Sequence, residues 1–167
     1  MSFKSPKGVI NALLDEYQVV ISDLKNNIAD IKDSDLEKII DQKTLNKDCV
    51  SIQSLLTHII HCGSFYITMI DIHRGNTGSI WPVRKKLNSV SEYNFALDEM
   101  MNHTNKFFEN IPQSEMSQYD PSKKILTFWG QLYDIEQLME HAIVHISRHR
   151  RQIQKFKSEL KKVKNLN

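Results

Sequence analysis

Four stretches of the chain repeat apolar residues at steps of three and four, the spacing of one helix face. The first follows Pro6, a residue suited to the first turn of a helix, and runs to about Ile31. The second starts at Ser51, a predicted N-cap, and ends at Arg74 and Gly75, where glycine favours termination. Each pattern predicts a helix with one apolar face.

The other two stretches are separated by a long connection. The third starts after Ser91 and stops at Pro112, which cannot continue a helix. Residues 113–133 then form a loop of 21 residues, whose apolar members should pack on the helices. The fourth stretch opens with Asp134 as N-cap and runs to about Leu160. Together they predict an all-α fold, a four-helix bundle with a long loop before the last helix.

Length and composition fit one domain spanning residues 1–167. The chain is 40% hydrophobic and has two cysteines, Cys49 and Cys62. A chain of this length can bury roughly two-thirds of its unfolded surface, so it needs no disulfide framework. No run approaches 18 apolar residues, and the first residues lack the apolar core of a signal peptide. We therefore expect a cytoplasmic protein with no membrane partner.

Positive charge is concentrated at the C-terminus. The formal net charge is +2, but residues 148–167 carry +7, so the rest of the chain carries −5. One interpretation of this charge is that the C-terminal segment binds nucleic acid. Against it, no aromatic residue is interleaved with the basic ones except Phe156, which belongs to the apolar stripe. Positive charge at a helix C-terminus also complements the helix dipole, so we expect no nucleic-acid partner.

Several histidines lie on or beside the apolar faces. At roughly 100° per residue, His149 falls inside the stripe of the fourth helix and His145 at its edge. His141 lies just beyond that edge. In the second helix, His58 lies inside the stripe and His61 at its edge. A buried imidazole is costly unless its nitrogen atoms find partners.

Two readings explain these buried imidazoles: each could hydrogen-bond a carbonyl or carboxylate, or three could bind one divalent metal ion. The i,i+4 spacing puts His145 and His149 on one face, and His58 can reach the same ion from the second helix. Three imidazoles leave a coordination position open, which is typical of a catalytic site. Zinc, nickel, iron and cobalt all accept imidazole, and we expect zinc or nickel. Cys62 is either a small buried apolar residue or a neighbour of the ion.

Three segments also resemble the DinB-like (DNA-damage-inducible) family. The run HAIVHISRHRRQI, residues 141–153, resembles the family's C-terminal signature of two histidines four residues apart followed by an arginine and a glutamine. The run SIQSLLTHI, residues 51–59, is similar to its second-helix motif, and GQLY at 130–133 is also similar. The resemblance implies a four-helix bundle, often a homodimer, whose metal ligands correspond to the residues His58, His145 and His149.

The same superfamily includes S-transferases and isomerases that use thiols such as bacillithiol or mycothiol. The resemblance therefore implies a low-molecular-weight thiol or an electrophile as the small-molecule partner. Two departures matter. Gly63 stands where the family often has an acid, which removes a candidate general base. Arg151 replaces the usual glycine and makes the rim of the site more basic.

The main functional hypothesis is a metal-dependent transferase or hydrolase. Arg150 could attract a carboxylate of the thiol, and His141 could contact the substrate or hold a metal-ligating histidine in place. We expect the open metal position to face a pocket bordered by the third helix and residues 113–133. The alternative is a metal-binding stress protein without catalysis, which Gly63 favours.

Overall fold

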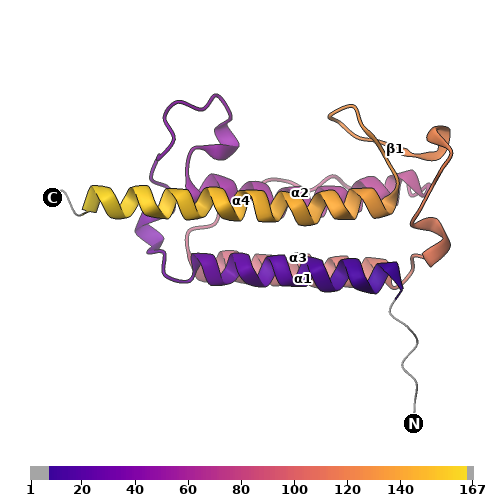
Figure 1. Ribbon diagram of the computed structural model, residues 1–167, viewed down its shortest axis with the longest axis horizontal. Coiled ribbons are helices and arrows are strands. Elements are labelled where there is room, and N and C mark those ends of the chain that lie inside the picture. Colours follow the sequence, from indigo (N-terminus) through magenta and orange to yellow (C-terminus); the bar gives the residue numbers. More distant parts are fainter. Residues whose placement is uncertain (1–7, 165–167) are drawn as a thin grey trace, which may run out of the picture.

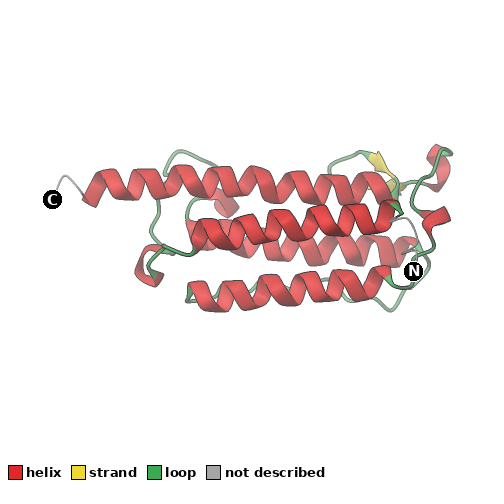
Figure 2. Cartoon of the chain, turned by 60° about the horizontal axis from the view of Figure 1, so that its bottom comes forward, coloured by secondary structure: helices red, strands yellow, loops and turns green. Residues whose placement is uncertain are grey.

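The computed structural model describes residues 8–164 and contains four long helices (Figure 1). Their bounds are α1 (Val9–Ile28), α2 (Ile52–His73), α3 (Val90–Phe108) and α4 (Ile135–Lys164). Figure 2 shows them lying side by side along one axis. The predicted all-α four-helix bundle is therefore confirmed, although α1 is shorter and α4 longer than the apolar pattern indicates. Pro6, the expected start of the first helix, lies outside the described residues.

The helices α2 and α3 run in the same direction. Near their starts, the Thr57 Oγ1 and Tyr93 hydroxyl oxygens lie 2.7 Å apart. Arg74, which caps the end of α2, pairs with Glu115, which follows the end of α3. The connection of residues 74–89 must therefore cross back along the bundle.

The helices α1 and α4 also share a direction, opposite to that of α2 and α3. Arg150 lies 3.9 Å from Asp23, and Lys157, further along α4, pairs with Asp30 just beyond the end of α1. Figure 1 shows both helices starting at the same end of the bundle. As a result α2 and α4 are antiparallel neighbours.

Local capping chemistry sets most helix ends. Ser51 caps α2 and accepts a hydrogen bond from the Ser54 amide, as predicted, and Gly75 has a φ of 99° directly after the cap at Arg74. The predicted start of α3 was wrong by two residues. Ser89, rather than Ser91, is its cap, because Ser89 and Glu92 form a reciprocal capping box.

Residues 113–133 are more ordered than a plain loop. They contain two short 3-10 turns, Gln113–Glu115 and Pro121–Lys123, and a hairpin of β1 (Ile125–Leu126) and β2 (Leu132–Tyr133). Asp134 then caps α4 and accepts a hydrogen bond from the Gln137 amide at 2.8 Å, as predicted. The hairpin stands beside the first turns of α4, where it can border a site on that helix (Figure 1).

The core is formed by the apolar faces of all four helices, and Gly63 lies within it. A Cβ atom at Gly63 would lie 2.2 Å from Met100 Sδ and 2.8 Å from the Tyr17 hydroxyl. Side chains of α1 and α3 thus fill the space where an acid at this position would begin.

Within residues 8–164, α2 is the one helix that is apolar and long enough to cross a membrane. This is weak evidence for a membrane span, because half of its most apolar stretch is buried in the bundle.

Candidate metal centre

The three predicted ligands meet between the second turn of α2 and the middle of α4. The Nε2 atom of His145 lies 3.0 Å from Nε2 of His58 and 3.2 Å from Nε2 of His149. The three ring centroids are 4.5–5.0 Å apart. His149 is 5% exposed, so the cluster begins in the core and reaches the surface of these helices.

These separations fit ligation of one ion. Imidazole nitrogen binds zinc at about 2.0–2.1 Å, so two such nitrogens lie about 2.9 Å apart at a right angle and about 3.4 Å apart in a tetrahedron. The two Nε2 separations at His145, 3.0 and 3.2 Å, lie within that interval. Each of these two contacts to His145 is therefore compatible with a pair of ligands on one ion.

The outer ring nitrogens have partners that orient two of the imidazoles. His58 Nδ1 lies 3.2 Å from Asp48 Oδ2, and His149 Nδ1 lies 3.0 Å from Gln152 Oε1. Both oxygens are acceptors, so each Nδ1 carries the hydrogen and each Nε2 presents a lone pair. Both Nε2 atoms contact Nε2 of His145, which can donate at most one hydrogen. One of the two contacts is therefore left without a hydrogen, and a cation lying among the three nitrogens would supply the missing partner.

Burial keeps the three imidazoles neutral. Desolvation, followed by repulsion from neighbouring imidazoles, lowers the pKa of His58 to about 4 and that of His145 to about 3. Burial also lowers the pKa of His149, although its hydrogen bond to Gln152 opposes this shift. At neutral pH the lone pairs are consequently free for a metal ion rather than occupied by protons.

Cys62 adds a thiol to this cluster. Ligand atoms of His58, Cys62 and His145 all lie within 4.8 Å of one another, so these residues also form a group that could hold a metal ion. The thiol lies against the ring of His58, since Sγ is 3.6 Å from Nε2 and 3.7 Å from Nδ1. Burial raises the pKa of the Cys62 thiol to about 11. The sequence pattern allowed two roles for Cys62, a small buried apolar residue or a neighbour of the ion.

Asp48 is a site residue that the sequence pattern missed. It lies in the 3-10 turn Lys47–Cys49 and pairs both with His58 and with Arg84 from the crossover connection. The family resemblance indicates an acid within α2, at the position of Gly63. The carboxylate comes instead from the segment before α2, which folds back over that helix and carries no periodic signal.

His141 lies on the other side of the cluster, as a neighbour of His145. Its ring stacks on Trp129 at 4.7 Å with an interplanar angle of 18°, and lies 6.1 Å from the His145 ring at 24°. Tyr66 meets His141 and His145 edge-on. The hairpin therefore approaches the centre through Trp129, which is separated from His145 by the ring of His141.

The predicted role of Arg150 finds less support. Its guanidinium lies 3.9 Å from Asp23 on α1, so it extends toward that helix. Arg84 is the cation tied to the histidine cluster, through Asp48. The sequence pattern did not indicate Arg84 because it lies in the connection between α2 and α3.

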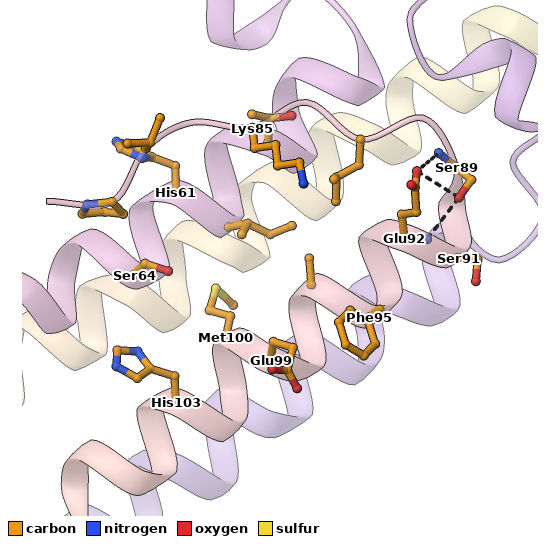
Figure 3. Close-up of a pocket in the computed structure, with 16 residues that line it drawn as sticks. His61, Ser64, Lys85, Ser89, Ser91, Glu92, Phe95, Glu99, Met100 and His103 are labelled. Carbon is orange, nitrogen blue, oxygen red and sulfur yellow. Dashed lines mark hydrogen bonds between the residues drawn. The ribbon is translucent and has the colours of Figure 1, made fainter. Parts of the chain in front are cut away.

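A separate groove of about 870 Å³ lies between α2 and α3 under the crossover connection. Figure 3 shows His61 and Ser64 of α2 facing Met100 and His103 of α3 across it. His61 Nδ1 is buried without a hydrogen-bond partner among the described residues. The lining includes none of the three clustered histidines, so the α3 side chains expected beside the metal border this groove instead.

No family model, curated protein or solved structure matches the chain. The likeness to the DinB-like family therefore rests on the three sequence segments alone. What the structure adds is the geometry of the histidine cluster.

Proposed function

We propose that the protein binds one divalent metal ion through His58, His145 and His149 and uses it to activate a small-molecule thiol or water for transfer or hydrolysis. One observation carries the metal site. Nε2 of His145 contacts Nε2 of both His58 and His149, at 3.0 and 3.2 Å. The oxygen partners of the other two rings favour the hydrogen on Nδ1, so one proton on His145 cannot satisfy both contacts.

His149 fits the ligand set better than Cys62. Gln152 holds His149 with its Nε2 directed inward, whereas the Cys62 sulfur lies almost equally far from both ring nitrogens of His58. A sulfur in that place lies beside the ring and away from the line of the Nε2 lone pair. We therefore assign Cys62 to the wall of the site.

Three protein ligands leave room for a fourth, exchangeable one. A bound divalent ion would lower the pKa of a thiol or water there and so supply a nucleophile at neutral pH. The protein itself would orient the three ligating imidazoles. Asp48 orients His58, Gln152 orients His149, and the buried surroundings keep all three rings neutral. The likeness to thiol-dependent S-transferases favours a thiol as the activated group and an electrophile as its acceptor.

A non-catalytic metal-binding protein is the second candidate. The specific observation in its favour is that the carboxylate beside the cluster is not free. Asp48 is engaged by His58 and Arg84, and Met100 and Tyr17 fill the space beside Gly63. A bound thiol can lose its proton directly to solvent, so thiol transfer needs no such base, whereas activation of water would benefit from one. We therefore favour thiol transfer over hydrolysis.

The experiment is metal analysis of untagged protein purified without chelator. We expect about one zinc or nickel ion per chain and its loss in His149→Ala. His103→Ala removes an exposed histidine of α3 and is the matched control, which should keep the metal. Full metal content in His149→Ala would contradict the assignment.

Chemistry is tested in a second step. Cobalt-substituted Cys62→Ser protein, which lacks the neighbouring sulfur, should develop a sulfur-to-cobalt charge-transfer band when a low-molecular-weight thiol is added. The band should diminish when an electrophile consumes the bound thiolate. Metal binding without any band, and without conjugation of electrophiles, would leave the non-catalytic candidate.

A further inference from the structure

Large apolar side chains are exposed in two segments near the metal centre, residues 80–83 and 126–132. Exposed fractions reach 87% for Ile80, 88% for Val83 and 73% for Phe128, and Trp81 and Trp129 are 41% and 40% exposed. Concentrated apolar exposure of this kind marks binding surfaces in proteins. A surface built from ring side chains also favours an apolar ligand over a polar one.

Ring contacts join the two segments into one surface. Phe65 of α2 lies 4.7 Å from Trp81 and 5.1 Å from Phe128, and Trp81 lies 5.7 Å from Phe128. The next hairpin residue, Trp129, contacts Tyr66 edge-on at 6.3 Å. The tip of the hairpin thus holds the crossover connection and α2 together through aromatic rings.

The same surface is connected to the metal ligand His145 through ring contacts. Two ring-to-ring steps, of 4.7 and 6.1 Å, connect Trp129 through His141 to His145. In Figure 1 the hairpin and the segment of residues 36–50 both rise on the same side of α2 and α4, near opposite ends. A ligand that reaches the ion along the outer side of these helices therefore has Asp48 at one end and Trp129 at the other.

We propose that Trp129, with His141 and Tyr66 beside it, binds an apolar, preferentially aromatic group of the thiol or electrophile whose reactive atom lies at the metal. This inference rests on the proposed function and adds the substrate class. The ligand must be extended, since its apolar group is held two ring spacings from His145. Small aliphatic thiols would bind the ion but leave the aromatic surface uncovered.

The test compares two thiols on the same protein, using cobalt-loaded Cys62→Ser protein and the sulfur-to-cobalt band. Ethanethiol reports binding to the metal alone, and 4-phenylbutane-1-thiol adds a ring that can reach Trp129. We expect the phenyl thiol to bind more tightly. In Trp129→Ala its affinity should fall about tenfold while that of ethanethiol stays unchanged, because only the longer ligand loses the ring contact. Trp129→Phe should recover most of the difference.

Tyr119→Ala is the matched control, since it removes an aromatic side chain that is 93% exposed in the segment before the hairpin. It should leave both affinities unchanged. If the Cys62→Ser protein that retains Trp129 bound both thiols with equal affinity, the aromatic site would be overturned and the metal centre would stand. Failure to bind cobalt, or no band with either thiol, would instead overturn the proposed function.

Two other binding partners for the aromatic surface can also be detected by experiment. A second copy of the chain would make the mass in light scattering fall in Trp129→Ala, and a lipid surface would make the protein sediment with anionic vesicles through Trp129. Either result, together with an unchanged ratio of thiol affinities, would overturn the proposal.

Discussion

His58 Nδ1 and Asp48 Oδ2 lie 3.2 Å apart and connect the turn before α2 to the core of the histidine cluster. The carboxylate fixes which nitrogen of His58 carries the hydrogen, and so turns the Nε2 lone pair toward His145. Arg84 pairs with the same carboxylate from the crossover connection. Three separate segments of the chain thereby determine the orientation of one imidazole.

Asp48→Asn should weaken metal binding by about 10- to 100-fold, the usual effect of losing a carboxylate behind a ligating histidine. The amide can present its nitrogen to His58 and favour the wrong tautomer. Competition against a chelator of known affinity measures the change. Asp41→Asn, in the same connection, is the control and should bind normally. Unchanged affinity in Asp48→Asn would show that this carboxylate does not orient the ligand.

The metal-free protein should lose stability as the pH falls from about 6.5 toward about 4. Burial holds the pKa of His58 at about 4 and that of His145 at about 3, whereas both titrate near 6.5 when unfolded. The unfolded chain therefore binds more protons in this window, and the free energy of unfolding falls with decreasing pH. Each group contributes up to about 1.4 kcal/mol per pH unit.

Urea unfolding of chelator-treated protein at pH 7, 6 and 5 measures this slope. His145→Gln should flatten it, because one depressed pKa is removed, and the exposed His103→Gln should not. A slope identical in all three proteins would contradict the burial of neutral imidazoles.

Local chemistry explains why much of the bundle could be predicted. Caps such as Ser51 and Asp134 act within one helical turn, so their spacing in the sequence is sufficient to place them. The pair His145 and His149 is likewise visible at i,i+4. The start of α3 was misplaced because Ser89 and Ser91 are both plausible caps, and the Glu92 side chain decides in favour of Ser89.

Long-range contacts explain what could not be predicted. Asp48 reaches His58 only because residues 36–50 fold back over α2, and no periodicity encodes that path. Trp129 reaches His141 only because two strands of two residues each form a hairpin. Strands this short have no readable alternation, so the sequence pattern predicted that residues 113–133 border the site but not that Trp129 contacts His141.

Gly63→Ala should destabilise the fold by about 1–3 kcal/mol, the usual cost of overpacking a filled core. The new Cβ atom would meet Met100 Sδ at 2.2 Å and the Tyr17 hydroxyl at 2.8 Å, and Tyr17 is fully buried. Gly78→Ala is the matched control, since its nearest neighbour is 3.5 Å away. Thermal unfolding compares the two. Adding Met100→Ala should restore part of the loss, and equal melting of Gly63→Ala and the parent protein would contradict the close packing.

Cys62→Ser distinguishes the two ligand sets in the cluster. If His58, His145 and His149 hold the ion, the variant should retain about one metal per chain with little change in affinity, because the sulfur at 3.6 Å from His58 Nε2 lies beside the ring. The cobalt form of the parent protein should then show no sulfur-to-cobalt band until a thiol is added. A set made of His58, Cys62 and His145 predicts the opposite on both counts. A strong band in the untreated parent that vanishes in Cys62→Ser would make the thiolate a resident ligand, and an incoming thiol would have to displace it before any transfer could begin.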